Sequence, residues 1–181
     1  MFKRQLTAAL ICAIGVLTFV KSQAAPATRA QLREARLLVE RIGAYRRVTW
    51  HWERVIGVPR TPTANTASRS PDLAYRRWVM RLWQQRASRI LRLASAPPHR
   101  SSWSCIHRYE GGWHTNTGNG YYGGLQMDLT FQRRYGAFLL RSKGTADRWS
   151  PLEQMWVAEH AHRSGRGFYP WPNTARYCGL I

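Results

Sequence analysis

The sequence predicts a mainly helical α+β protein, in which an Arg-rich helical segment precedes a small C-terminal domain. Apolar residues recur at helical spacing over residues 29–45 and again before Leu93, which indicates two amphipathic helices. Six glycines crowd residues 111–124, and such a density of turn residues predicts a loop or an irregular hairpin. The 181 residues, 44% of them hydrophobic, suffice for a folded core and exclude a fully disordered chain.

Residues 1–24 have the layout of a secretory signal peptide. Lys3 and Arg4 precede an uncharged stretch at residues 6–20, and small residues follow at the expected cleavage position. At about 1.5 Å per residue this stretch spans roughly 22 Å, short of the ~30 Å hydrocarbon core of a bilayer. We therefore expect export and cleavage, with no stable membrane span afterwards. An uncleaved membrane anchor is the alternative.

Residues 25–100 are expected to form a basic helical region. The first helix covers residues 29–45, and residues 48–58 predict a further short helix, because apolar side chains recur in both. Residues 59–71 are rich in proline, threonine and serine and have no such periodicity. We therefore interpret them as a linker or a long loop.

The second long helix is expected to begin at Ser70, which caps it, with Pro71 at its first position. It should run to about Leu93 with one apolar face. Its other face has two interpretations: a solvated surface on a helix packed against the next domain, or a surface that binds anions or membranes. The arginines of this face are Arg76, Arg77, Arg81, Arg89 and Arg92.

The C-terminal unit, residues 101–181, contains one strong helix start. Ser150 is a cap residue, and Glu153 stands three positions later, which is the spacing of a capping box. The Gly-rich run interrupts the helical pattern earlier in this unit. The elements expected here are helices at 103–109, 129–140 and 150–164 and an irregular hairpin at 121–127.

The formal net charge of +19 predicts a polyanionic partner. Residues 25–100 contribute 16 arginines and four acids, a net +12, whereas residues 101–181 contribute a net +4. Nucleic acid, anionic lipid and an acidic wall polymer all match this charge. Export argues against nucleic acid, so we expect anionic cell-wall polymers as partners of the basic region.

Export also changes the meaning of the three cysteines. Cys12 would leave with the signal peptide, so that Cys105 and Cys178 remain, an even number in an oxidising compartment. We therefore expect a disulfide between them. A closed loop of this length contributes about 4 kcal/mol to stability in the chain-entropy model.

Glu110 is the first candidate for a catalytic acid. It follows an apolar helix face and precedes two glycines, and aromatic residues lie close to it in sequence. A carboxyl group among aromatic rings is partly desolvated, which raises its pKa as a general acid at neutral pH requires. The alternative is a solvated acid at a helix end. Aromatic and amide side chains that suit a sugar chain follow it: Trp113, Asn116, Asn119, Tyr121, Tyr122 and Gln126.

Two runs of residues carry a resemblance to a known family. Residues 103–113 (WSCIHRYEGGW) and 116–126 (NTGNGYYGGLQ) resemble the catalytic domain of actinobacterial resuscitation-promoting factors, a transglycosylase-like family related to lysozyme. Trp171 with its following proline, and Cys178, support the resemblance near the end of the chain. The similarity covers roughly residues 101–179.

The resemblance implies a small lysozyme-like domain and a secreted, wall-associated bacterial enzyme that cleaves peptidoglycan between N-acetylmuramic acid and N-acetylglucosamine. Glu110 falls on the family's catalytic glutamate, and Gln126 lies in the segment that lines the cleft. Two departures stand out. The family's first cysteine usually precedes the catalytic glutamate directly, where this chain has Tyr109. Arg166 stands about where members commonly carry a glutamine in the cleft, which leaves subsite preference open.

The reaction route is also open. Asp128 lies two residues past Gln126 and is the best candidate for a second carboxylate, which a hydrolase would need. A lytic transglycosylase instead uses one glutamate as acid and then base while the muramic acid 6-hydroxyl attacks, and we favour this route. Two alternatives lie outside catalysis: a wall-binding or signalling protein that uses the same cleft, and a polyanion binder that uses the Arg-rich helices.

We expect a monomer without a metal or other cofactor. His160 and His162 could be combined with His107 or His114 into a metal site. Residues two positions apart on a helix face away from each other, however, which argues against a shared ion.

Overall fold

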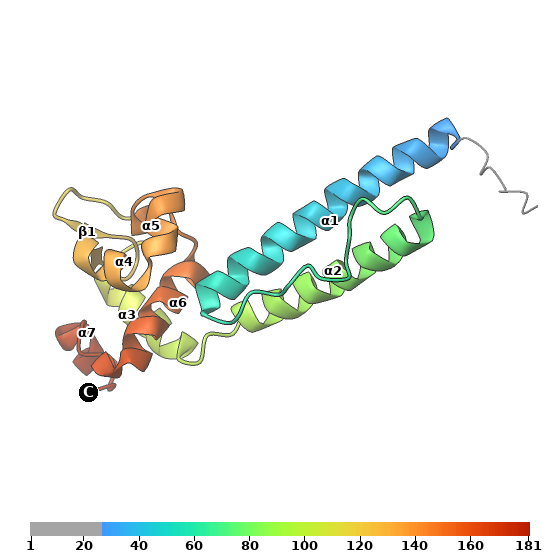
Figure 1. The fold of residues 1–181 in the computed structure, drawn as a ribbon. Coiled ribbons are helices and arrows are strands. Elements are labelled where there is room, and N and C mark those ends of the chain that lie inside the picture. Colours follow the sequence, from blue (N-terminus) through green and yellow to red (C-terminus); the bar gives the residue numbers. More distant parts are fainter. Residues whose placement is uncertain (1–26) are drawn as a thin grey trace, which may run out of the picture.

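The structure is a computed structural model that describes residues 27–181. Two long helices, α1 (Arg29–Ile56) and α2 (Leu73–Ala94), lie side by side and run in the same direction, and both end at a small helical domain (Figure 1). We call these two parallel helices the helix pair and their C-terminal ends its base. The signal peptide predicted at residues 1–24 lies outside the described residues. No described helix combines the length and the apolar character that crossing a bilayer demands.

The small domain begins with α3 (Arg100–Glu110). A short antiparallel sheet follows, in which β1 (Tyr121–Tyr122) pairs with β2 (Met127–Asp128). This confirms the prediction of a mainly helical α+β protein. The remaining elements are α4 (Leu129–Tyr135), α5 (Ala137–Lys143), the 3₁₀ turn η1 (Ala146–Arg148), α6 (Pro151–Ala161), the wide turn η2 (His162–Arg166) and α7 (Pro172–Tyr177).

Helix α1 is a single helix of 28 residues, where the sequence suggested two. Thr28 begins it with a capping box, and Gly57 ends it in a left-handed conformation. Gly43 lies inside the helix without breaking it, no proline occurs between residues 29 and 56, and the buried face continues through Thr49 and Ile56. Packing against α2 along this face therefore maintains the helix where the apolar pattern weakens.

Helix α2 starts two residues later than predicted, because Asp72 and not Ser70 is its cap. The Asp72 carboxylate accepts hydrogen bonds from the backbone N–H groups of Ala74 and Tyr75, at 2.8 and 3.2 Å. The Ser70 hydroxyl instead accepts from the backbone of Asp72. An ionised oxygen that accepts two N–H groups at a helix N-terminus outcompetes a single hydroxyl.

The loop between the two helices lies against them. Trp50 of α1 donates from Nε1 to the carbonyl of Thr61 at 2.9 Å, and the buried Glu53 accepts from the backbone N–H of Thr61 at 2.9 Å. From the other helix, the hydroxyl of Tyr75 donates to the carbonyl of Asn65 at 2.7 Å. Residues 59–71 therefore form a loop that hydrogen bonds fix to both helices, and they are not a linker between separate units.

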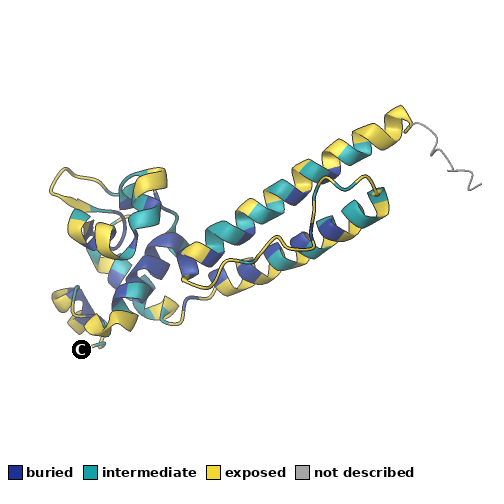
Figure 2. Cartoon of the chain, viewed as in Figure 1, coloured by how far each residue is buried: buried dark blue, intermediate teal, exposed yellow. Residues whose placement is uncertain are grey.

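A single hydrophobic core joins the base of the helix pair to the small domain. Ile56 of α1 and Ile90 of α2 are buried in the same cluster as Trp103 and Trp156 of the domain (Figure 2). Trp156 also donates from Nε1 to the carbonyl of Ala94 at 2.8 Å. A second, smaller cluster lies farther out between the two helices. The helix pair is thus attached to the domain through shared packing.

The helix predicted at residues 129–140 is broken at Gly136 into α4 and α5. A Cβ atom at Gly136 would lie 2.6 Å from the ring of Trp149, which is fully buried. Glycine therefore allows the close approach of backbone and ring at the break. The capping box predicted at Ser150 and Glu153 is confirmed at the start of α6.

Candidate functional site

Glu110 is the last residue of α3 and lines a hollow of about 230 Å³. Its Oε1 accepts a hydrogen bond of 2.7 Å from the hydroxyl of Thr174 in α7. The hollow is formed by segments from three parts of the domain. The other residues that line it are Tyr121, Gln126, Pro170, Trp171, Pro172 and Asn173.

A second hollow of about 190 Å³ adjoins the first and shares Tyr121, Gln126 and Trp171 with it. It adds Asp128 and Arg166, so that one acidic and one basic side chain lie along its walls. We call the two hollows together the groove. The groove therefore runs from Glu110 at the end of α3, past the exposed Tyr121, to Asp128 and Arg166. These last two side chains carry opposite charges.

Gln126 is held in the groove by an unusual backbone. Its φ of 45° lies in the left-handed region, which residues other than glycine rarely adopt and which is frequent at functional sites. Its side chain donates from Nε2 to the carbonyl of Gly123 at 2.8 Å. Trp171 donates from its indole N–H to the carbonyl of Leu125 at 2.6 Å. These bonds place the turn before β2 and the C-terminal tail on the same wall of the groove.

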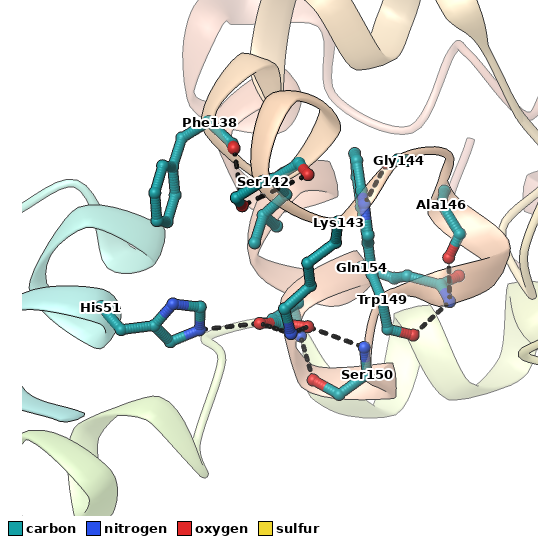
Figure 3. A network of polar contacts seen from close by, with 11 residues as sticks. His51, Phe138, Ser142, Lys143, Gly144, Ala146, Trp149, Ser150 and Gln154 are labelled. Carbon is teal, nitrogen blue, oxygen red and sulfur yellow. Dashed lines mark hydrogen bonds and ion pairs between the residues drawn. The ribbon is translucent and has the colours of Figure 1, made fainter. Parts of the chain in front are cut away.

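The buried Gln154 of α6 supports this turn from behind. Its Oε1 accepts from the backbone N–H of Gly124 at 2.8 Å, and its Nε2 donates to the carbonyl of Trp113 at 2.8 Å. The same Nε2 donates to the carbonyl of Ala146 at 2.9 Å (Figure 3). A Cβ atom at Gly123 would lie only 2.5 Å from Gln154 Oε1. The glycines of the motif thus permit close contact between the turn and α6.

Glu153, next to Gln154, is a structural acid. Its buried carboxylate contacts His51 and Lys143, both at 2.7 Å, and accepts from the backbone N–H of Ser150 at 2.8 Å (Figure 3). Burial raises the pKa of Glu153, but these hydrogen bonds and the charge of Lys143 outweigh it and lower the pKa to about 2. The carboxylate therefore links α1, α5 and α6 in its ionised form.

Asp128 has a structural role in addition to its place in the groove. Its Oδ1 accepts from the backbone N–H of Phe131 at 2.6 Å, so that it caps α4. The side chain is exposed. A carboxylate that caps a helix keeps one oxygen engaged.

Four of the predicted sugar-contacting residues do not line the groove. The ring of Trp113 stacks on that of His107, with centroids 3.9 Å apart. Tyr122 packs against the core. The side chains of Asn116 and Asn119 accept from the backbone N–H groups two residues later, at 3.2 and 3.0 Å, and so shape the loop before β1. Of the predicted contacts, Tyr121, Gln126 and Arg166 do line it.

Sequence reasoning missed Trp171 and Asn173, which line the groove, and Thr174, which is bonded to Glu110. Their position depends on a disulfide between Cys105 and Cys178, which ties the end of α7 to α3. The available signal was the Trp-Pro pair that begins α7, together with the second cysteine just after this helix.

The histidines named for a metal site do not gather. His160 contacts the carbonyl of Val55 at 2.7 Å, and His114 that of Asp147 at 2.7 Å. A different group does form: His99, Glu159 and His162 have potential ligand atoms within 4.8 Å of one another.

Glu159, in that group, is a structural acid of the core. Its fully buried carboxylate accepts from the indole N–H of Trp103 and the backbone N–H of His99, both at 2.8 Å. Burial raises the pKa of Glu159, yet these bonds outweigh it and lower the pKa overall. Burial and the neighbouring His99 lower the pKa of His162. Neutral N–H donors thus compensate an ionised carboxylate inside the core.

Comparisons with known proteins agree with the resemblance. The model of the family "Transglycosylase-like domain" matches residues 98–174, a range that contains Glu110, the groove and Thr174. Resuscitation-promoting factor RpfE of Mycobacterium tuberculosis is 39% identical over 87 residues, which are 45% of this chain and 47% of that protein. Resuscitation-promoting factor Rpf1 of Corynebacterium glutamicum is 34% identical over 89 residues, 48% of this chain and 44% of that protein.

The chain therefore spans about half the length of the curated relatives that it matches. The helix pair precedes the residues that the family model matches, although its base packs against them in the shared core. The C-terminal half of this chain contains a transglycosylase-like domain of the resuscitation-promoting factor type.

Proposed function

We propose that this protein is secreted and cleaves the glycan strands of peptidoglycan, with Glu110 as general acid and base. One observation carries the proposal: a carboxyl group stands in an open groove of a transglycosylase-like domain, oriented by the Thr174 hydroxyl. Catalytic acids need this combination of access for a substrate and a restrained side chain. The bond attacked joins N-acetylmuramic acid to N-acetylglucosamine.

Glu110 acts twice in the route that we favour. As an acid it protonates the glycosidic oxygen, and the bond from this oxygen to the sugar C1 breaks. As a base it then accepts the proton of the muramic acid 6-hydroxyl, whose oxygen attacks C1. The product is a 1,6-anhydro sugar, and no water is consumed. Asp128 caps α4 and is not needed as a second carboxylate in this route.

The other groove residues suit contacts with a sugar chain. The ring of Tyr121 is about half exposed (48%), which leaves a face for stacking on a sugar. Gln126 offers an amide to hydroxyl and N-acetyl groups. The guanidinium of Arg166, in the second hollow, offers N–H donors to the carbonyl oxygens of N-acetyl and lactyl amide groups.

The deciding experiment is digestion of purified peptidoglycan by residues 25–181, with the soluble products analysed by mass spectrometry. New muropeptides with 1,6-anhydro ends are expected from the natural sequence, and none from Glu110→Gln. Glu40→Gln, an exposed acid on α1, is the matched control and should retain full activity. Equal activity of a folded Glu110→Gln variant would refute the assignment.

The same products separate the remaining alternatives. Reducing ends together with a strong loss in Asp128→Asn would instead assign hydrolysis with two carboxylates. Saturable binding to peptidoglycan without new muropeptides would assign a non-catalytic wall-binding protein.

A further inference from the structure

A pocket of about 500 Å³ lies where α1 meets α5, away from the residues of the groove. Three arginines line it, two from α1 and one from the following loop: Arg47, Arg54 and Arg60. We call it the arginine pocket. Trp50 and Phe138 supply its aromatic walls. Its volume is in the range of sites for small molecules or for single units of a polymer.

The positive charge of the arginine pocket is not neutralised by acidic side chains of the described residues. None of the three arginines forms an ion pair within residues 27–181. The nearby Glu153 is already neutralised by Lys143, and Glu53 is buried and bonded to Thr61. No acidic side chain lines the pocket. Its positive charge is therefore available to an anionic ligand.

Two of the guanidinium groups are held in place by aromatic rings. Arg60 lies 3.9 Å from the centroid of Trp50, and Arg54 lies 4.3 Å from that of Phe138. A guanidinium stacked on a ring keeps its N–H edges free for a bidentate oxyanion. Trp50 is itself fixed by its hydrogen bond to the loop, and His51 beside Phe138 (Figure 3) is fixed by Glu153. The donors are thus preorganised.

Two features of the pocket argue against two other kinds of polyanion. Single-stranded nucleic acid is bound through free aromatic faces on which its bases stack, whereas here guanidinium groups cover faces of both rings. Binding to a lipid surface relies on a protruding apolar face, whereas this site is a hollow. An anionic sugar or polyol chain can place single charged groups in the hollow.

We propose that the arginine pocket binds an oxyanion, either phosphate or carboxylate, carried on the sugar or polyol chain of an anionic polymer. All the lining residues except Phe138 precede residue 98, so packing of the helix pair on the transglycosylase-like domain completes the pocket. The pocket gives the basic helix pair a specific contact in addition to its diffuse charge. The proposal does not depend on the chemistry of Glu110.

The test is calorimetric titration of the full chain with poly(glycerol phosphate) and with polygalacturonate of matched length and at matched ionic strength. Arg54→Gln combined with Arg60→Gln should raise the Kd by about tenfold or more, the scale of one or two lost charged hydrogen bonds. Arg36→Gln combined with Arg41→Gln removes the same charge from exposed positions of α1 and should change the Kd by less than about threefold. The polymer that binds more tightly identifies the oxyanion.

A further variant guards against misfolding. Arg47→Gln removes an arginine that is exposed and makes no aromatic stack, so it should weaken binding while the thermal unfolding midpoint stays unchanged. Equal losses in the pocket pair and the surface pair would overturn the proposal in favour of diffuse charge. Tighter, pocket-dependent binding of single-stranded DNA or of phosphatidylglycerol vesicles would overturn the class of ligand.

Discussion

The hydroxyl of Thr174 in α7 donates a hydrogen bond of 2.7 Å to Oε1 of Glu110 at the end of α3. The two residues are 64 positions apart in the chain. Trp171, one turn earlier, is bonded to Leu125, and Cys178 after α7 is bonded to Cys105. The orientation of the candidate acid is therefore set by the last residues of the domain.

Replacement of Thr174 by valine should lower the turnover number about tenfold, because the restrained orientation of Glu110 is lost with the hydrogen bond. KM should change little, since the groove walls remain. Thr174→Ser keeps the donor and should restore most of the turnover. Steady-state kinetics on soluble glycan fragments measure both values. If the valine and serine variants behave alike, the hydroxyl does not position Glu110.

Removal of the disulfide should destabilise the domain and impair the groove together. The bond closes a loop of 73 residues, for which chain entropy predicts a loss of about 4 kcal/mol in Cys105→Ser with Cys178→Ser. Denaturant unfolding measures the free energy. Activity should fall even in conditions where the variant is folded, because α7 with Thr174 is no longer tied to α3. Full activity of the folded variant would contradict this coupling.

The ionised Glu153 predicts a loss of stability in acid. Its pKa is about 2 in the folded protein against an ordinary value of 4.5, so ionisation favours folding. The contribution, of order 3 kcal/mol, is present in full above pH 4.5 and is lost as the pH falls from 4.5 towards 2. Glu153→Gln should flatten this part of the stability profile, whereas the exposed Glu40→Gln should not. Parallel profiles of Glu153→Gln and the natural sequence between pH 5 and pH 3, roughly, would argue against this role.

The shared core predicts that the helix pair and the domain unfold together. Ile56→Ala, in the buried base of α1, should cost about 2–5 kcal/mol and lower the midpoint seen by both circular dichroism and tryptophan fluorescence. Leu37→Ala, on the exposed side of α1, is the control and should cost less than about 0.5 kcal/mol. Two separate transitions would show that the helix pair is an independent unit.

Features that depend on neighbours in sequence could be predicted. The capping box of Ser150 and Glu153 spans three residues, and so its chemistry is visible in the sequence. The start of α2 was placed two residues early, because Ser70 and Asp72 are both good caps and only the folded backbone shows which oxygen meets the free N–H groups. The full length of α1 was missed for a related reason, since contact with α2 sustains it.

The groove likewise contains some residues that could be predicted from the sequence and others that could not. Tyr121 and Gln126 were predicted because they lie in one Gly-rich run close to Glu110 in the chain. Thr174 and Trp171 were missed because about 60 residues separate them from Glu110 and only folding brings them there. Trp113 has a suitable side chain for sugar, yet its ring stacks on His107.

The sequence by itself determined the class of fold, the resemblance of the C-terminal half and the pair of cysteines, because each depends on local pattern or on composition. The tertiary structure decided that Thr174 holds Glu110, that Glu153 links three helices, and that Arg54 and Arg60 face one pocket with Phe138. These contacts join distant segments through the packing of a shared core, and their partners cannot be identified from spacing along the chain.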